Sequence, residues 1–236
     1  MGEGEGGLTE TPHANSPGLM PRIDFKLYLI TDRKLAAARG LVETVEAALQ
    51  AAAEAAPQPP IAIQLREKNL EGRALIQLAA ELKQICRTYR VPILVNGRID
   101  VALAAGADGV HLPSDGIAPN EARKLIGPSK LIGVSTHTAG EITRAEALGA
   151  DFAVFGPVFA PLSKGTYAAP SGPQALSAAC SAASIPVFAL GGINAARVPE
   201  LQSTGAAGVA AIGAIIGARD PAQATRELLN ALQKWE

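Results

Sequence analysis

The sequence predicts an α/β protein folded as a single (β/α)8 TIM barrel, and three observations support this prediction. From Phe25 onward, short apolar runs alternate with amphipathic, alanine-rich segments of helical periodicity. The alternation repeats through about 210 residues, the length of a compact barrel. The apolar runs are hydrophobic on both faces, which is typical of parallel strands covered by helices.

A doubly wound open sheet is the alternative arrangement of alternating strands and helices. Such a sheet usually carries a glycine-rich dinucleotide-binding turn after an early strand. No such turn is present in the sequence, so we favour the barrel.

The apolar runs predict eight strands, which are, in chain order, Lys26–Thr31, Ile61–Leu65, Ile93–Val95, Gly109–Leu112, Leu131–Val134, Phe152–Phe155, Pro186–Ala189 and Gly208–Ile212. The segments that follow them predict eight helices, which are Leu41–Glu54, Gly72–Tyr89, Ile99–Ala105, Pro119–Ile126, Gly140–Leu148, Gly172–Ala183, Ala195–Ser203 and Pro221–Trp235.

Two similar tripeptides, Gly106-Ala107-Asp108 and Gly149-Ala150-Asp151, join a helix to the next strand. Glycine is the usual residue at such a helix end. In a barrel these joints lie at the face opposite the catalytic one. We therefore predict structural roles for Asp108 and Asp151.

Composition limits the classes of partner. The chain has 236 residues, 48% of them hydrophobic, and a formal net charge of -1. No apolar run reaches the ~18 residues of a membrane span, and the balanced charge argues against nucleic acid or an anionic membrane as partner. Cys86 and Cys180 lack metal-ligand spacing and predict reduced core thiols of a cytoplasmic protein.

Residues 1–22 differ in composition from the rest of the chain. They are rich in Gly, Glu, Pro and Thr and lack the basic and apolar regions of a signal peptide. We predict a disordered N-terminal tail at 1–22 and the barrel domain at 23–236.

The predicted strand Ile61–Leu65 leads into Arg66-Glu67-Lys68. Alternate residues of a strand point to one side, so Arg66 and Lys68 are expected to converge on one spot. A phosphate or pyrophosphate is the natural occupant of such a spot. A solvated turn is the simpler alternative, because Arg and Lys are mostly exposed.

Glycines follow the last two predicted strands. Gly191-Gly192 comes after the seventh and Gly213 after the eighth. The loops after these strands form the common phosphate site of such barrels, where glycine lets backbone N–H groups approach the anion. An ordinary tight turn is the alternative explanation of the glycine pair.

Two further side chains are candidates at the same face. Lys164 lies in the long loop Ala160–Ser171, which has no strand or helix pattern and suggests a lid. His137 follows the fifth strand and is the leading candidate for proton transfer, since histidine is the commonest general acid or base. His111 lies inside a strand, so we expect it to be packed.

The strand ends together resemble the thiamine phosphate synthase/thiazole tautomerase superfamily. The resemblance covers residues 26–235 in family order and rests on Tyr28-Leu29-Ile30-Thr31-Asp32, Gln64-Leu65-Arg66-Glu67-Lys68, Ala107-Asp108-Gly109-Val110-His111-Leu112, Gly133-Val134-Ser135-Thr136-His137, Phe155-Gly156-Pro157-Val158-Phe159 and Leu190-Gly191-Gly192-Ile193. One branch couples hydroxymethylpyrimidine pyrophosphate to thiazole phosphate with Mg²⁺. The other aromatises a carboxythiazole phosphate by moving a proton, without a metal.

The resemblance assigns roles to individual positions. The pyrimidine-pyrophosphate contacts of the synthases correspond to Gln64, Arg66, Lys68, Asn96, Ser135 and Lys164. The thiazole phosphate site corresponds to Gly192, Ile212 and Gly213. In the tautomerase branch, His137 corresponds to the residue that shuttles the proton.

The chain departs from the synthase pattern at the two magnesium carboxylates. Gly97 and Gly116 stand at those positions, and Asn96-Gly97-Arg98 and Leu112-Pro113-Ser114 resemble the tautomerase branch. Mg²⁺ prefers carboxylate and phosphate oxygens. The residues therefore predict no metal site and no cofactor, unless Asp115 or Glu67 is recruited to Mg²⁺.

The absence of the two magnesium carboxylates decides which of three functional hypotheses we place first. The first is a metal-independent thiazole tautomerase with His137 as catalytic residue and a small phosphorylated thiazole as substrate. The alternative is a Mg²⁺-dependent thiamine phosphate synthase, which would also bind the pyrimidine substrate. The third is a non-catalytic protein that binds thiazole or thiamine phosphates. The sequence leaves a homodimer open.

Overall fold

The computed structural model describes residues 23–36, 39–160 and 169–235 of the chain. The tail predicted at 1–22, most of the predicted lid loop and Lys164 lie outside these residues. The strands of the described residues are β1 (Leu27–Ile30), β2 (Ile61–Leu65), β3 (Ile93–Asn96), β4 (Gly109–Leu112), β5 (Leu131–Thr136), β6 (Phe152–Phe155), β7 (Val187–Leu190) and β8 (Gly208–Ala211).

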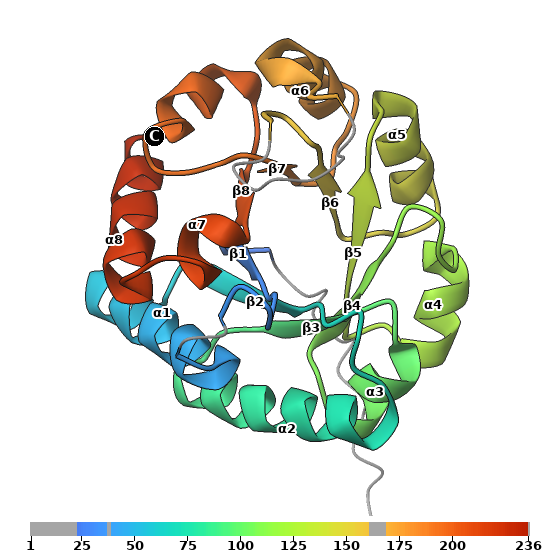
Figure 1. Ribbon diagram of the computed structural model, residues 1–236. Coiled ribbons are helices and arrows are strands. Elements are labelled where there is room, and N and C mark those ends of the chain that lie inside the picture. Colours follow the sequence, from blue (N-terminus) through green and yellow to red (C-terminus); the bar gives the residue numbers. More distant parts are fainter. Residues whose placement is uncertain (1–22, 37–38, 161–168, 236) are drawn as a thin grey trace, which may run out of the picture.

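These strands form a closed parallel barrel in sequence order, as Figure 1 shows. The barrel closes where β1 pairs with β8, with Leu27 opposite Val209. The predicted (β/α)8 barrel is therefore confirmed.

Helices surround the barrel (Figure 1). They are α1 (Leu41–Ala55), α2 (Gly72–Thr88), α3 (Ile99–Ala104), α4 (Pro119–Ile126), α5 (Ala139–Ala147), α6 (Gly172–Ser181), α7 (Gly213–Ile216) and α8 (Pro221–Leu232), with 3-10 helices η1 (Val198–Thr204) and η2 (Gln233–Trp235).

The structure differs from the predicted elements at several places. The helix predicted at Ala195–Ser203 is the 3-10 helix η1, a seven-residue segment that ends at Gly205 in the left-handed conformation. The short helix α7 follows β8 and was not predicted. Strand β5 continues to Thr136, so Ser135 lies within the strand.

Two apolar cores result from the alternation of strand side chains. One lies between the barrel and its helices. The other fills the barrel interior around Phe25, Tyr28, Phe152 and Phe188. There Phe25 stacks on Phe188 with ring centroids 4.9 Å apart, and Phe152 meets Phe25 edge-on at 5.5 Å. These packed rings therefore fill the barrel interior at their level.

The face at the amino ends of the strands is held by two carboxylates. Asp151 accepts hydrogen bonds from the Ile132 backbone N–H at 2.6 Å and from Arg123 at 2.8 Å. Asp108 accepts one from the Ile93 N–H at 2.9 Å and pairs with Lys83. Each carboxylate ties one strand to its neighbour, and the geometry agrees with the structural roles predicted for both.

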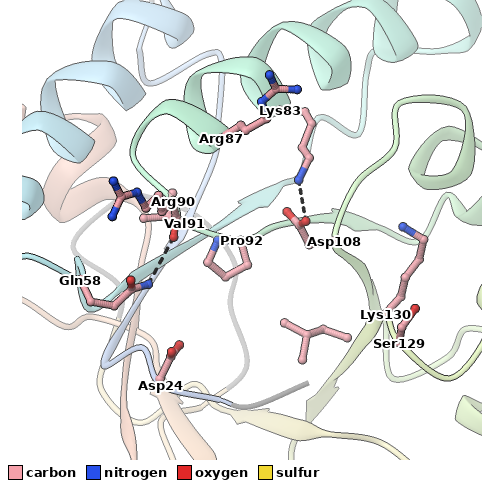
Figure 2. Close-up of a pocket in the computed structure, with 11 residues that line it drawn as sticks. Asp24, Gln58, Lys83, Arg87, Arg90, Val91, Pro92, Asp108, Ser129 and Lys130 are labelled. Atoms are coloured by element: carbon pink, nitrogen blue, oxygen red, sulfur yellow. Dashed lines mark hydrogen bonds and ion pairs between the residues drawn. The ribbon is translucent and has the colours of Figure 1, made fainter. Parts of the chain in front are cut away.

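A cavity of about 530 Å³ opens at this same face (Figure 2). Its charged lining residues are Asp24, Lys83, Arg87, Arg90, Asp108 and Lys130. Arg87 lies in the last turn of α2, where a cation complements the helix dipole. The Lys83–Asp108 pair in Figure 2 belongs to the joint described above. We therefore regard this cavity as part of the stabilising face of the barrel.

The two cysteines are free thiols, Cys86 buried and Cys180 half-buried. Burial raises the pKa of Cys86 to about 12 and that of Cys180 to about 11. Neither thiol is poised to react, in keeping with the predicted core role. Among the helices of the described residues, none has the length and apolar character needed to cross a membrane.

Gly133 of β5 provides a test of interior packing. A Cβ added there would lie 2.4 Å from Cζ of Phe152 and 2.8 Å from Nδ1 of His111. Gly133→Ala should lower the free energy of unfolding by roughly 1–3 kcal/mol, because both rings are packed and cannot retreat freely. Urea denaturation measures this change.

The matched control is Gly140→Ala in α5, where an added Cβ meets nothing within 4 Å. This change should stabilise the protein by up to about 1 kcal/mol, since alanine is the better helix former. Equal stability of Gly133→Ala and the parent would contradict the crowding.

Candidate active site

Four polar side chains lie at the carboxyl ends of neighbouring strands, on the side that faces the barrel interior. Ala62 and Leu94 belong to the interior core, and residues two positions further along a strand face the same way. The four are Gln64 of β2, Asn96 of β3, His111 of β4 and Ser135 of β5. The pairing of Asn96 with His111 places these two side by side.

Arg66 is half-buried just beyond β2, and its backbone N–H donates to the Thr31 hydroxyl at 2.9 Å. Its guanidinium acts on the imidazole of His111. Burial and this nearby positive charge lower the pKa of His111 to about 3. His111 is therefore neutral near pH 7. Arg66 places a positive charge close to the polar side chains of the barrel interior.

Lys68 is placed differently from the expectation. It lines a cavity of about 390 Å³ together with Asn96 and Gly97, and Arg66 is not among the lining residues. Strand β2 ends at Leu65, and the chain then turns, with the Leu70 N–H bonded to the Glu67 carbonyl. Strand alternation no longer applies beyond Leu65, so the predicted convergence of Arg66 and Lys68 is not seen in this cavity.

Glu67 lies between these two cations and is committed to the β1 loop. Its carboxylate accepts from the Thr31 hydroxyl at 2.8 Å and from the Arg33 backbone N–H at 3.0 Å. Only 6% of its side chain is exposed. Glu67 therefore joins the loops that follow β1 and β2 at the carboxyl-end face of the barrel, which we call the mouth. Its oxygens are not available to a metal.

His137 lies just beyond β5 and is exposed. Its Nδ1 lies 2.6 Å from the Gly156 carbonyl oxygen, which can only accept, so Nδ1 carries the proton. Its Nε2 lies 3.4 Å from the Ser114 hydroxyl. The backbone N–H of His137 donates to Glu141 at 2.6 Å. The contact with the Gly156 carbonyl fixes the tautomer in which Nε2 is the acceptor, the form that a general base requires.

The predicted phosphate loops depend on glycine. Gly191 and Gly192 have φ of 106° and 60°, and an added Cβ at Gly192 would lie 2.2 Å from the Ala160 carbonyl oxygen. Arg197 donates to the Gly192 carbonyl at 2.9 Å and lies over the Phe159 ring. After β8, Ile212 and Gly213 begin the short helix α7. A short helix at this place is a recurrent part of barrel phosphate sites.

The positions of the two absent carboxylates do not fit a magnesium ion. Gly97 has φ of 68°, a conformation that disfavours a side chain, and an added Cβ at Gly116 would lie 3.1 Å from the Pro113 carbonyl oxygen. Across 23–36, 39–160 and 169–235, no group of three or more Asp, Glu, His or Cys side chains could hold a metal. Asp115 is exposed on the loop.

Sequence reasoning missed two residues that contribute to this site and one hydrogen bond. Arg197 buttresses the glycine loop, but an arginine in a loop carries no signal of that contact. Ser114 lies beside His137, and only the Leu-Pro-Ser motif hinted at it. His111 was expected to be packed, which is correct, but its hydrogen bond to Ser135 was not foreseen.

Comparisons with known proteins found a matching family and similar chains. The model of a family described as thiamine monophosphate synthase matches residues 27–215. A relative from Geobacter sulfurreducens is 46% identical over 213 residues, covering 90% of this chain and 97% of its own. A thiamine-phosphate synthase of Moorella thermoacetica is 40% identical and covers 91% of this chain and 98% of its own.

A solved structure gives the same result. Thiamine phosphate pyrophosphorylase from Pyrococcus furiosus superposes with a TM-score of 0.78 and 35% identity, covering 90% of this chain and 98% of that one.

Glu67 provides a test of how the mouth is held. Glu67→Ala should lower the free energy of unfolding by about 1–3 kcal/mol, because the Thr31 hydroxyl and the Arg33 N–H lose their partner. Thermal denaturation measures the loss. Glu71→Ala is the control, since Glu71 is exposed and makes no side-chain bond at the start of α2. Equal stability of both variants would refute the fastening role.

Proposed function

The chain belongs to the thiamine monophosphate synthase family, and we propose that it is a thiamine phosphate synthase, a transferase that joins hydroxymethylpyrimidine pyrophosphate to thiazole phosphate. This proposal departs from the first hypothesis of the sequence analysis and adopts its alternative. The names of close relatives support the change.

The observation that carries the proposal is that groups suited to binding anions lie in two separate places at the carboxyl ends of the strands. One set lies at the carboxyl ends of β2, β3 and β5 and contains Arg66, Asn96 and Ser135, and Lys68 lines the adjacent cavity with Asn96. The other is the backbone after β7 and β8, at Gly191-Gly192 and Ile212-Gly213. A transferase with two phosphorylated substrates requires two such sets. The partners of this chain are then small phosphorylated molecules.

The residues act by positioning and by charge. The pyrophosphate leaves with the electron pair of the bond that it breaks, so negative charge grows on its oxygens. Arg66 and Lys68 stabilise that charge by charge-assisted hydrogen bonds, and Ser135 adds a hydroxyl donor. Glycine N–H groups at the other set hold the thiazole phosphate. Holding both substrates in one mouth makes the reaction effectively intramolecular.

No residue of this chain is assigned to magnesium in these steps. The resemblance implies Mg²⁺ for a synthase, but the donors around Gly97 and Gly116 do not fit a metal held by this chain. The chain's own part in neutralising the pyrophosphate is therefore assigned to the cations of the mouth in this proposal. Free thiols in the described core suit a reducing cytoplasm, where we place the reaction.

A coupling assay tests the proposal. Purified full-length protein with both substrates and Mg²⁺ should release pyrophosphate and form thiamine phosphate in equal amounts. Arg66→Gln should lower the rate at least tenfold, because one charge-assisted bond to the leaving group is lost. Chromatography of the thiamine phosphate measures both.

Arg98→Gln is the matched control, since Arg98 is engaged with Asp100 at 2.8 Å and should lose less than twofold. Absence of coupling in the parent protein would overturn the proposal. Absence of any turnover, with thiazole phosphate still bound, would favour the non-catalytic alternative.

A second candidate function is supported by the glycines at the magnesium positions and by the ring orientation of His137. A metal-independent thiazole tautomerase needs one base that takes a proton from a ring carbon and returns it nearby. His137 presents Nε2 as acceptor at the mouth. Arg66 would then face the carboxylate of the substrate.

His137→Asn tests this second candidate. Isomerisation of the carboxythiazole phosphate should fall at least 100-fold, because general base catalysis contributes about 10²–10⁴. Binding of thiazole phosphate, measured by calorimetry, should stay within about threefold, since the phosphate is held by backbone elsewhere. Retained isomerisation in the variant would rule out the role of His137.

A further inference from the structure

A line of hydrogen bonds runs through the upper barrel interior and joins two predicted site residues. The Gln64 amide Nε2 donates to the Tyr28 hydroxyl at 3.4 Å. That hydroxyl lies 3.4 Å from Nδ1 of His111, and Nε2 of His111 lies 2.9 Å from the Ser135 hydroxyl. Gln64, Tyr28 and His111 are each no more than 1% exposed.

The surroundings hold the central imidazole in place. Tyr28 and Phe152 approach the ring with centroids at 5.6 and 6.1 Å. On a third side, Gly133 leaves the space that a Cβ would take, 2.8 Å from Nδ1. The ring is therefore confined, and its two nitrogens keep their partners.

A continuous line of donation has two possible polarities, since a neutral imidazole donates from one nitrogen and accepts at the other. With the Gln64 amide donating, the Tyr28 hydroxyl donates to Nδ1 of His111. Nε2 then donates to Ser135, and the Ser135 proton is free to point into the mouth. With the amide reversed, the direction of every hydrogen bond reverses. The Ser135 hydroxyl then donates its proton to Nε2 of His111, and this proton cannot point into the mouth.

The first polarity suits an anion and the second does not. An anion at the mouth needs donors, and Arg66 already supplies positive charge close to His111. A hydroxyl that receives a hydrogen bond is also a better donor, because hydrogen bonds in a chain polarise one another. The orientation in the structure, with Nε2 of Gln64 toward Tyr28, is the first polarity.

We propose that Tyr28 and His111 are positioning residues that aim the Ser135 hydroxyl proton at a pyrophosphate oxygen, and that Gln64 sets the direction of the line. This inference deepens the proposed function and rests on it for the identity of the anion. Gln64 thereby acts through Ser135, beside the direct contact with substrate that the family resemblance implies.

The tautomer of His111 tests the polarity without any substrate. Nitrogen NMR of the full chain labelled in histidine should show Nε2 of His111 protonated and Nδ1 unprotonated. His111→Gln assigns the signals, and a glutamine can still offer an N–H donor near the place of Nε2. Protonation at Nδ1 in the parent protein would overturn the inference.

A double-mutant cycle tests the link to the ligand, with inorganic pyrophosphate as probe in calorimetry. Tyr28→Phe should raise the Kd about five- to tenfold in the parent and less than twofold in the Ser135→Ala background, because its effect passes through Ser135. In coupling assays, the same variant should raise the KM of the pyrimidine substrate more than it lowers kcat. Equal effects of Tyr28→Phe in both backgrounds would overturn the inference.

Thr136→Val is the matched control for lost stability. Thr136 is the next residue of β5, it is buried, and its hydroxyl donates to the Val154 carbonyl at 3.2 Å. It should lower stability as Tyr28→Phe does and leave the Kd within about twofold. His111→Gln should restore more pyrophosphate binding than His111→Leu, and equal loss in both would count against the donor role.

The two proposals fail differently. A parent protein that does not bind pyrophosphate refutes the proposed function, and the His111 tautomer then decides the inference on its own. A parent protein that binds pyrophosphate with no coupling between Tyr28 and Ser135 keeps the function and refutes the inference.

Discussion

Closure of the eight strands by the β1–β8 pairing is the constraint on which the remaining structure depends. Once the barrel is closed, side-chain alternation leaves two environments for every strand residue. Outward residues join the helices, and inward residues stack in layers. The aromatic layer around Phe25 and Phe188 fills the interior below, so the polar residues of the next layer can only face one another or the mouth. The hydrogen-bond line from Gln64 to Ser135 is a product of that confinement.

Backbone conformation is a second constraint, because it decides which positions at the mouth can carry a charged side chain. Gly97, Gly191 and Gly192 adopt positive φ, which side chains rarely do. At Gly191-Gly192 the neighbouring chain leaves no room for a side chain, since a Cβ added at Gly191 would lie 2.7 Å from the Pro157 Cα. Gly97 has the same conformation, and it occupies the position where the family resemblance would place a magnesium-binding carboxylate. The described part of the mouth therefore offers backbone donors and the cations Arg66 and Lys68, while the carboxylate of Glu67 is bonded to Thr31.

The sequence could predict what depends on local pattern. Apolar runs such as Phe152–Phe155 predict strands because both faces are buried, and Asp108 and Asp151 were placed correctly at the structural face. Elements set by a few residues were missed. Helix α7 has only four residues, and η1 has helical composition but ends after seven. Arg66 does not line the cavity that Lys68 lines, and the prediction of their convergence extended the alternation rule past Leu65, where the strand ends. Long-range bonds, such as that between His111 and Ser135, leave no trace in local pattern.

Charge distribution links the fold to the chemistry. A chain with net charge of -1 has no global field to attract phosphorylated substrates. Attraction must then come from local groups that are poorly screened, and burial supplies them. Arg66 is half-buried, so less water separates it from an anion and each unit of charge acts more strongly. The same burial keeps His111 neutral, which preserves an imidazole with one donor and one acceptor. One physical condition, low exposure of the upper barrel interior, therefore serves both the cation and the hydrogen-bond line. Opening that interior to water would weaken the two together.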